Sequence, residues 1–205
     1  MSPRTSENFK EIRDIRKQQL KDTAIELFGM KGYAATKISE ITGKAELIHG
    51  LFYHYFKTKE ELYVSVIIEL LETIIDTINK AKDESESPLK QLVWLTGVTH
   101  SGSLKEGVYR HILILQALYS DLLPQQVKQE IVEKYHLMVD LIAKIIEEGQ
   151  QVGEFIEGDP EELAIYHLSL VHGLLLTNAR KTEPIKLSVD KVLRQLKPYT
   201  QQGDS

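Results

Sequence analysis

Apolar residues recur along most of the chain at the spacing of amphipathic helices. In the first such segment, Leu20, Ala24, Leu27 and Phe28 occupy positions i, i+4, i+7 and i+8, which form one face of an α-helix. After Thr58, every fourth residue is apolar over a longer stretch: Leu62, Val66, Leu70, Ile74 and Ile78. No segment alternates convincingly in the manner of a β-strand. The pattern predicts an all-α chain of about nine helices.

Capping residues predict where several helices begin and end. We expect the first helix to start near Ser6 or Asn8 and to end at Gly32, because glycine accepts the left-handed conformation that follows a helix. Later helix starts are marked by cap residues followed by proline or by an acid three positions on: Thr58 with Glu61, Ser87 with Pro88, and Asp159 with Pro160. Short helices are expected at 37–44, capped by Thr36, and at 48–55.

The helix expected from residue 160 to about residue 180 is apolar on most of its sides. Such a helix must be covered on more than one face, either in the centre of its domain or against another chain. The last expected helix, 189–196, is amphipathic. Together, 163–176 and 189–196 hold more apolar surface than a small body easily hides. This predicts a two-fold homodimer through the last two helices.

Composition narrows the possible chemistry. The 205 residues include no cysteine, which excludes disulfides, cysteine-ligated metals and thiol catalysis. No apolar segment near the start reads as a signal peptide. The longest apolar stretch, 163–176, is shorter than the ~18 residues of a membrane span. We therefore expect a soluble cytoplasmic protein.

Charge is divided unevenly along the chain. The net charge of the whole chain is −5. Residues 1–59 hold 11 Lys/Arg and 7 Asp/Glu, a net charge of +4, whereas residues 60–205 hold 14 Lys/Arg and 23 Asp/Glu, a net charge of −9. A basic first part can meet an anionic partner, and it can equally be a solvated surface. We place a domain boundary here, with a DNA-binding domain at 1–60 and a ligand-binding and dimerisation domain at 61–205.

Two short helices joined by a three- to four-residue turn, at 37–44 and 48–55, predict a helix-turn-helix. The residues that carry the pattern are Ala24, Leu27, Phe28, Gly32, Tyr33, Thr36, Ile38, Ile41, Ala45, Gly50, Phe52, Tyr53, Tyr55, Phe56, Lys59 and Leu62. With this spacing, about 50 residues resemble the DNA-binding domain of the tetracycline-repressor (TetR) family. The rest of the chain is similar to that family only in its expected architecture.

Candidate DNA contacts come from two places. The first residues of the second helix of such a motif reach base edges in the major groove, and here these are His49, Gly50 and Leu51. A helix N-terminus binds phosphate, which makes Thr36 and the adjacent Lys37 candidates. Further candidates are Tyr53, His54 and Lys59. The resemblance implies phosphate contacts for Thr36, Tyr53 and Lys59, and groove-facing positions for His49, Gly50, Leu51 and His54.

Several of these residues also have a purely structural interpretation. We expect Phe52, Tyr55 and Phe56 to be core residues, and Tyr53 either a phosphate contact or a structural residue. The basic residues near the start belong either to a flexible arm or to the exposed face of the first helix: Arg4, Lys10, Arg13, Arg16 and Lys17.

Two residues depart from the family pattern. Glu46 stands where the turn usually carries glycine, and a left-handed backbone there costs ~1 kcal/mol or more. Ile48 stands where the recognition helix usually has a serine or threonine cap, whose loss costs another ~1 kcal/mol. Glu46 also brings a negative charge close to DNA phosphates. Both departures bear on the strength of DNA binding.

The resemblance implies that the second domain binds a small ligand and transmits a helix shift to the DNA-binding domain. Polar and aromatic residues on its expected helices are candidates for lining a pocket that takes a small, largely apolar ligand: Tyr63, Trp94, Tyr109, His111 and His167, with His100, Tyr119 and His172 as further members. His167 and His172 are five residues apart, a poor spacing for a metal pair on one helix face. We therefore predict no metal site, and we expect no cofactor.

Three classes of function remain. The leading one is a ligand-responsive, dimeric transcriptional regulator, most simply a repressor, that binds a palindromic operator in double-stranded DNA. The second is a helical dimeric interaction module whose head has lost specific DNA binding, as Glu46 and Ile48 suggest. The third is a helical enzyme, which we do not expect because no phosphate-binding loop, zinc-binding helix motif or catalytic cluster occurs in the sequence.

Overall fold

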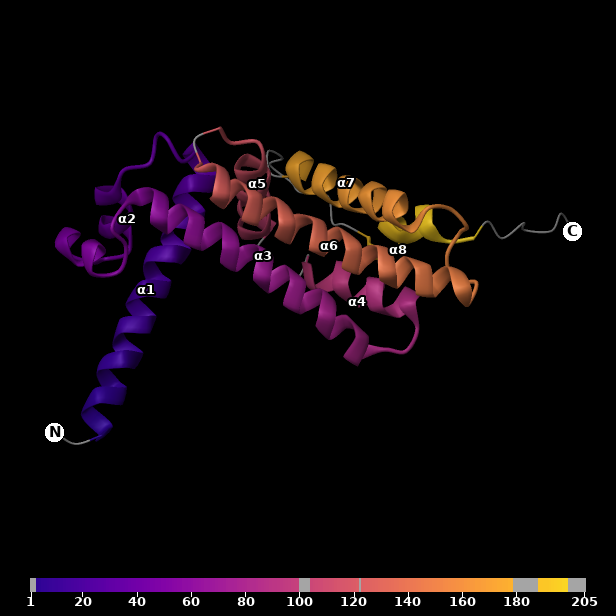
Figure 1. Cartoon of the computed structure of the whole chain (residues 1–205), viewed down its shortest axis with the longest axis horizontal. Helices are drawn as coiled ribbons and strands as arrows, with labels where there is room; N and C mark the ends of the chain where they lie inside the picture. Colours follow the sequence, from indigo (N-terminus) through magenta and orange to yellow (C-terminus); the bar gives the residue numbers. More distant parts are fainter. Residues whose placement is uncertain (1–2, 100–103, 122, 179–187, 199–205) are drawn as a thin grey trace, which may run out of the picture.

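A computed structural model describes residues 3–99, 104–121, 123–178 and 188–198. Every regular element in these ranges is a helix, which confirms the predicted all-α class (Figure 1). The elements are α1 (Pro3–Lys31), α2 (Ile38–Lys44), η1 (His49–His54), α3 (Lys59–Glu84), α4 (Pro88–Thr99), α5 (Leu104–Leu118), α6 (Gln125–Gln151), α7 (Pro160–Asn178), α8 (Val189–Leu193) and η2 (Arg194–Leu196), where η denotes a 3₁₀-helix. We call α1, α2 and η1 the head, and α3 to η2 the body.

The first helix is longer than its sequence pattern predicts. It begins at Pro3, and its first turns project away from the rest of the molecule (Figure 1). Side chains from Asn8 to Gln19 are exposed, and burial starts only at Leu20. The helix ends where predicted, because Gly32 has a φ of 84° and its N–H donates to the Phe28 carbonyl at 2.8 Å.

The predicted helix caps are present at three helix starts. The Thr58 hydroxyl accepts from the N–H of Glu61 at 3.0 Å at the start of α3. The Ser87 hydroxyl accepts from the N–H of Lys90 at 3.2 Å at α4. The Asp159 carboxylate accepts from the N–H of Glu161 at 2.9 Å at α7. Local residue choice thus decides where these helices begin.

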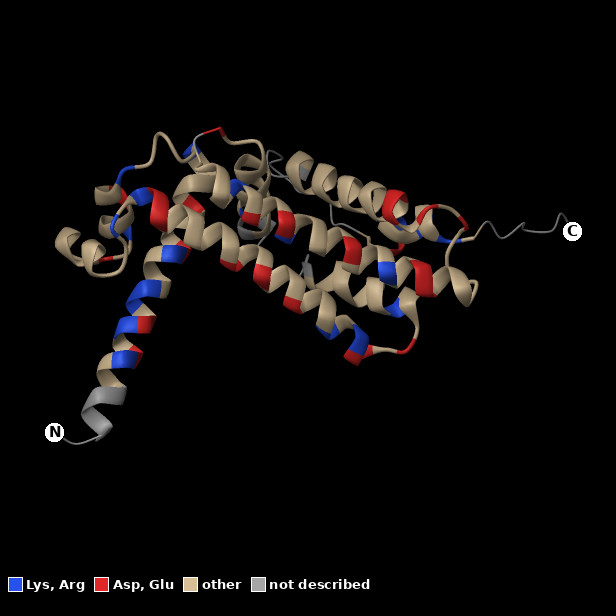
Figure 2. Ribbon diagram, in the orientation of Figure 1, with Lys and Arg blue, Asp and Glu red and all other residues tan. Residues whose placement is uncertain are grey.

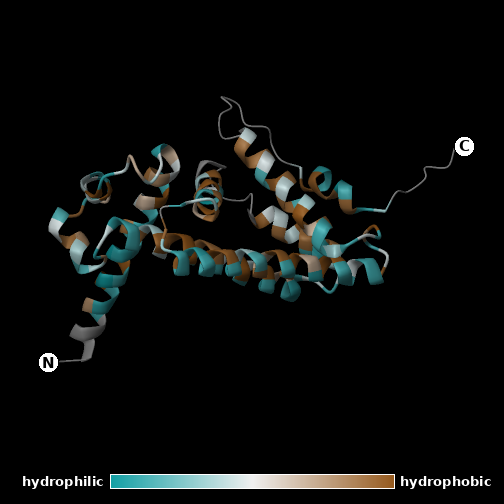
Figure 3. Ribbon diagram, turned by 45° about the horizontal axis from the view of Figure 1, so that its top comes forward, coloured by the Kyte–Doolittle hydropathy of each residue, from teal (hydrophilic) through white to brown (hydrophobic). Residues whose placement is uncertain are grey.

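The body is built around two long helices, α3 and α6, that lie side by side (Figure 1). Helix α7 packs along α6, and α4 lies against α3 and α6. Helix α5 lies between α1 and the rest of the body. Helix α7 keeps one apolar face in solvent, with Ile165, Tyr166 and Leu176 among its exposed residues. Brown and pale residues run along most of this helix in Figure 3. No helix in the described part of the chain combines the length and apolarity of a membrane span.

The last helix differs from the expectation for 189–196. It divides into α8 and η2, and Val192, Leu193 and Leu196 are buried within this one chain. Its apolar stripe packs against the body helices, including α4 and α7. The stripe is therefore already covered, and it gives no reason to expect a second chain at this surface.

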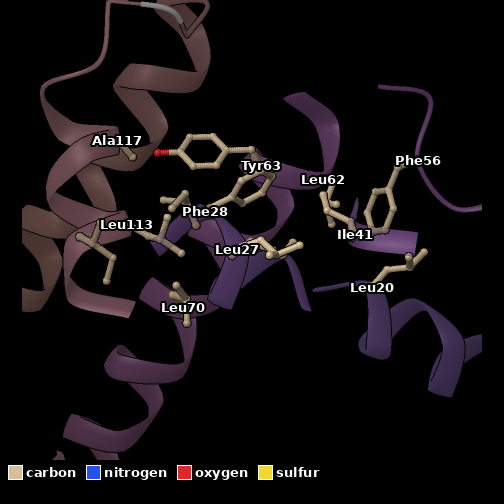
Figure 4. Close-up of a cluster of buried hydrophobic side chains, with 14 of the residues drawn as sticks. Leu20, Leu27, Phe28, Ile41, Phe56, Leu62, Tyr63, Leu70, Leu113 and Ala117 are labelled. Carbon is tan, nitrogen blue, oxygen red and sulfur yellow. The ribbon is translucent and has the colours of Figure 1, made fainter. Parts of the chain in front are cut away.

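One apolar core joins the head to the neighbouring end of the body (Figure 4). Phe28 of α1 meets Tyr63 of α3 edge-on, with ring centroids 5.4 Å apart, and the Tyr63 hydroxyl points toward Ala117 of α5. We call this the head–body core, and its members include Leu20, Phe28, Ile41, Phe52, Leu62, Tyr63, Leu113 and Ala117. Burial raises the pKa of Tyr63 to about 12. Tyr63 is a member of this core and is not among the residues that line the cavity described below.

Candidate nucleic-acid interface

The recognition segment presents most of its side chains to solvent. In η1, Phe52 is fully buried, where it meets Phe56 at a centroid distance of 5.9 Å. His49, Gly50, Tyr53 and His54 are exposed. Leu51 is half-buried. A buried aromatic anchor thus holds an exposed edge that is available for DNA.

This segment is a 3₁₀-helix, whereas the sequence predicts an α-helix at 48–55. The N–H of Leu51 donates to the Ile48 carbonyl at 2.8 Å, and that of Tyr55 donates to the Phe52 carbonyl at 2.9 Å. These are i→i+3 bonds, which are common in short helices. The segment is only six residues long, has a glycine in second place, and begins at a residue whose side chain caps nothing.

The turn before η1 contains both departures from the family pattern. Glu46 is the one non-glycine residue with positive φ, 56°, in the described part of the chain. Ile48 occupies the cap position with 84% of its surface exposed. The turn is closed by the N–H of Leu47, which donates to the Thr42 carbonyl at 2.9 Å. The turn therefore holds a strained glutamate and an isoleucine that gains little from burial.

Glu46→Gly and Ile48→Ser are each expected to stabilise the full chain by ~1 kcal/mol. Glycine removes the strain of a left-handed residue, and serine offers an oxygen to the first N–H groups of η1. The measurement is urea unfolding followed by circular dichroism. Glu46→Gln is the matched control, since it removes the charge and leaves the backbone strained. It should leave stability nearly unchanged and tighten non-specific DNA binding. Lower stability in both single variants would contradict this account.

Thr36 does not offer its hydroxyl to solvent. Its side chain is only 1% exposed, and Oγ1 donates to the carbonyls of Gly32 at 2.8 Å and Leu27 at 3.3 Å. The cap position of α2 belongs to Lys37, one residue later than expected. The hydroxyl thus closes the end of α1, which corrects its expected capping role. It also leaves a phosphate contact through Oγ1 without geometric support.

The N-terminus of α2 is occupied by a carboxylate of the same helix. The N–H of Lys37 donates to Glu40 Oε2 at 2.8 Å, and Glu40 also pairs with Lys31. The hydrogen bond from Lys31, followed by that from the Lys37 backbone, lowers the pKa of Glu40. A phosphate approaching this terminus meets the carboxylate first. The exposed side chain of Lys37 remains a candidate DNA contact.

Lys59 is directed into the protein and not toward solvent. Its ammonium donates to the carbonyls of Tyr33 at 2.7 Å and Thr36 at 2.8 Å, with a third contact to that of Ala34 at 3.4 Å. It also lies 4.3 Å from the centroid of the Tyr33 ring. Partial burial lowers the pKa of Lys59. Lys59 therefore ties the loop between α1 and α2 to the start of α3, and its geometry does not support the expected phosphate contact.

Basic residues on the projecting part of α1 are exposed on a helix rather than on a flexible arm (Figure 2). They are Lys10, Arg13, Arg16 and Lys17. Lys31 and Lys44 in the head are instead paired with Glu40 and Glu26. The side chain of Arg4 lies outside the described residues. The sequence does not show which of these basic residues form ion pairs, because the pairs of Lys31 and Lys44 depend on how α1 and α2 pack.

The body contains a cavity of about 80 Å³ with three histidines in its wall. His111 lines it from α5, and His167 and His172 line it from α7. We call it the histidine cavity. Most of its other lining residues are apolar: Ile74, Ile78, Leu95, Ile114, Met138, Ile142, Leu168 and Val171. Thr96 and Tyr135 complete the wall.

The remaining candidates for a ligand pocket lie elsewhere. Trp94 is partly buried in the body core, and Tyr109 packs against Gly29 of α1. Tyr119 is 82% exposed, and His100 lies outside the described residues. Of the candidate ligand residues, the structure therefore brings His111, His167 and His172 together and separates Tyr63, Trp94 and Tyr109 from them. Sequence spacing could not show this, since His111 and His172 meet only through packing of α5 on α7.

Helix α5 connects the histidine cavity with the head. His111 and Ile114 line the cavity, while Leu113 and Ala117 belong to the head–body core. Tyr109 on the same helix lies so close to Gly29 that a Cβ there would be 2.5 Å from the tyrosine Cβ. A displacement of α5 therefore acts directly on α1.

Comparison with known proteins identifies the same segment of the chain. Residues 20–66 match the model of "Bacterial regulatory proteins, tetR family". The fatty acid metabolism regulator protein of Bacillus subtilis is 28% identical over 148 residues, which cover 71% of this chain and 74% of that protein. The transcriptional repressor KstR2 of Mycolicibacterium smegmatis is 30% identical over 80 residues, 39% of each chain.

A solved structure has the same fold over most of its length. It is a transcriptional regulator from Saccharomonospora viridis in complex with choline, with a TM-score of 0.68 and 19% identity. The match covers 87% of this chain and 91% of that one. The helical architecture predicted beyond the helix-turn-helix thus also occurs in a solved structure.

Proposed function

The chain belongs to the TetR family of DNA-binding transcriptional regulators, and from this premise we propose that it is a homodimeric repressor released from its operator by a small ligand. Members of this family are regulators and not enzymes. The observation that carries the proposal is the exposed edge of η1, anchored by the buried Phe52. The repressor role follows the simplest mode of action, in which a bound protein blocks transcription.

The DNA contacts that we propose divide into two groups. His49, Gly50 and Leu51 at the start of η1 read base edges, and His54 lies one turn further along the same groove. Tyr53 donates its hydroxyl to a phosphate, and Lys37 adds a charge. Lys59 and Thr36 act indirectly, by holding the loop that positions α2.

The exposed face of α7 supports a dimer. Ile165, Tyr166, Ser169, Gly173 and Leu176 are all exposed and lie along this helix. At Gly173 nothing approaches the position of a Cβ within 4 Å, so that a second helix can lie close there. A two-fold axis at this face would present two heads to a palindromic operator. Light scattering should therefore give twice the mass of the chain, and half that mass for Gly173→Glu.

Ligand release is supported by the position of α5. A ligand that enlarges the histidine cavity displaces a helix whose opposite face contacts α1. For release, the ligand must bind the DNA-free conformation more tightly than the DNA-bound one.

Binding to DNA from the region upstream of the chain's own gene tests this function. In fluorescence anisotropy, Tyr53→Phe should weaken binding about tenfold on every sequence, because one hydrogen bond to a charged phosphate is lost. His49→Ala or Leu51→Ala should instead change which sequences are preferred. Tyr119→Phe, at an exposed tyrosine of the body, is the control and should bind as the wild type does.

One observation favours the second function, a helical dimeric interaction module that does not bind DNA specifically. Glu46 in a strained turn and the uncapped start of η1 weaken the recognition segment. A wild-type dimer that binds no DNA sequence better than competitor DNA would favour an interaction module over a repressor.

A further inference from the structure

Basic side chains of the projecting turns of α1 share one face of the helix. Lys10, Arg13 and Lys17 are spaced i, i+3 and i+7, which keeps them within about 60° of one another around the helix axis. All three side chains are exposed. The acidic residues of the same turns, Glu11 and Asp14, lie outside this sector. We call Lys10, Arg13 and Lys17 the basic face of α1.

Other lysines at this end of the molecule are directed at groups of the protein itself. Three of them pair with a carboxylate: Lys21 with Glu69, Lys31 with Glu40, and Lys44 with Glu26. Lys59 donates to loop carbonyls. These lysines are held within the fold, whereas the basic face lies before Leu20, where burial of α1 begins. The basic face therefore offers positive charge to a partner from solution.

The basic face is oriented toward the recognition segment. Lys17 Nζ lies 5.6 Å from the centroid of the Phe56 ring, and Phe56 follows the end of η1 by two residues. Arg13 and Lys10 lie about one and two turns before Lys17 on the same face. Figure 2 shows the blue ribbon of these turns at the end of the molecule that also holds α2. DNA that contacts the exposed edge of η1 thus approaches the side of α1 that carries the basic face.

The projecting turns are long enough to follow a DNA strand. Residues 8–19, all exposed, span about 18 Å along the helix axis at a rise of about 1.5 Å per residue. Lys10 and Lys17 are about 10 Å apart along this axis, which matches the axial rise of about three phosphates on one strand. A recognition helix occupies only one stretch of major groove. Helix α1 can therefore add backbone contacts that η1 does not make.

We propose that the basic face of α1 is a second DNA contact on each head, which binds backbone phosphates of double-stranded DNA. This rests on the proposed DNA-binding function and adds an element to it. Lysine and arginine bind phosphate through charge and hydrogen bonds and release counterions from DNA. Such contacts are independent of base sequence, so they strengthen specific and non-specific binding alike. A chain with a net charge of −5 gains its attraction to DNA from a local face in this way.

A lipid surface is the main alternative partner for these turns. Phe9, Ile12 and Ile15 are exposed on another side of the helix, as in helices that lie on membranes. Glu11 lies about 40° from Ile15 around the axis, so that an acid borders the apolar side where anionic headgroups would meet it. Membrane-bound helices are instead rich in lysine and arginine beside their apolar face. DNA therefore fits the arrangement of charges better.

Fluorescence anisotropy of the full chain with a 40-base-pair duplex of random sequence tests the proposal, because random sequence isolates the phosphate contacts. Lys10→Gln combined with Arg13→Gln should weaken binding at least tenfold at 0.1 M KCl. The slope of log K against log salt should become less steep by about two for each bound chain, one for each lost contact. Both positions are exposed, so the double variant should keep the helix content and the unfolding curve of the wild type.

Matched controls separate a contact from a general effect of charge. Lys80→Gln combined with Lys144→Gln removes two positive charges from exposed lysines of α3 and α6. This control should change neither affinity nor slope, because exposed charges separated by more than a Debye length of about 8–10 Å are largely screened. Glu11→Gln changes the charge of the projecting turns outside the basic face, and it should leave the slope unchanged.

A cross-link gives a second, independent measurement. The chain contains no cysteine, so Lys10→Cys provides a single site for a thiol-reactive photo-crosslinker. Irradiation with the same duplex should join this position to DNA. The same label at Lys80→Cys should give no cross-link. This readout does not depend on how much affinity a lost charge costs.

Three results would overturn the proposal. One is a double variant, Lys10→Gln with Arg13→Gln, that binds the duplex with the affinity and salt slope of the wild type. Another is the absence of a cross-link from position 10. The third is binding to phosphatidylglycerol vesicles that the double variant loses while its DNA binding is unchanged, which would favour a lipid surface.

Failure of this contact is distinguishable from failure of the proposed function. The repressor is tested by the preference of the wild type for the upstream DNA over competitor DNA. Because phosphate contacts carry no sequence information, the double variant should keep that preference as a ratio of affinities. A protein without any sequence preference would fail as a repressor and could still show the α1 contact on random DNA.

Discussion

Replacing Gly29 by alanine is expected to destabilise the full chain by about 1–3 kcal/mol, because the new methyl group overpacks a tight helix crossing. An added Cβ would lie 2.5 Å from Cβ and 2.6 Å from Cγ of Tyr109. These atoms are close to the backbone of α5 and cannot swing aside, so α1 and α5 must separate. Urea unfolding of the full chain measures the loss. The same variant should also weaken DNA binding, since α1 supports the head.

Two further variants make this result specific. Gly97→Ala in α4 is the matched control, because nothing lies within 4 Å of its Cβ position. It should gain up to about 1 kcal/mol from improved helix propensity. Tyr109→Ala combined with Gly29→Ala should cost less than the two single changes added together, as expected for residues in contact. A Gly29→Ala protein as stable as the wild type would contradict the tight crossing.

Lys59→Met is expected to cost about 2–3 kcal/mol of stability, because hydrogen bonds from a charged group to the loop carbonyls are lost. DNA affinity should fall as the loop between α1 and α2 loosens. The dependence of affinity on salt should stay unchanged, since the ammonium is already engaged by the protein. A direct phosphate contact would instead reduce the slope of log K against log salt by about one.

The control for this prediction is Lys80→Met, at an exposed lysine of the same helix, which should leave stability and salt dependence as they are. Unfolding curves and anisotropy titrations at several salt concentrations give both quantities. A stable Lys59→Met protein with a reduced salt slope would restore the phosphate contact expected from the family resemblance.

Local features of the fold were predictable from the sequence because their causes are local. Gly32 ends α1 through its own positive φ, and Thr58 and Ser87 cap helices that start at the next residue. The buried face of α1 follows from the spacing of Leu20, Ala24 and Phe28. Glu46 occupies the glycine position of the turn, but only the structure shows that its φ is positive, at 56°.

Features that depend on distant contacts were not predictable in this way. Lys59 contacts carbonyls more than twenty residues earlier, and those carbonyls converge only after α1 and α2 have packed. Thr36 looks like a helix cap in sequence but folds back onto α1. The apolar stripe of α8 suggested an exposed interface, because no periodicity indicates whether a helix of the same chain covers it.

The head–body core also bears on how the molecule unfolds. Phe28 and Phe52 of the head share one cluster with Leu113 and Ala117 of α5. A fragment cut after residue 60 would leave the apolar face of α1 without its partners from α3 and α5. Head and body should therefore melt in a single cooperative transition, with equal calorimetric and van't Hoff enthalpies. The boundary we propose at residue 60 separates two roles within one folding unit.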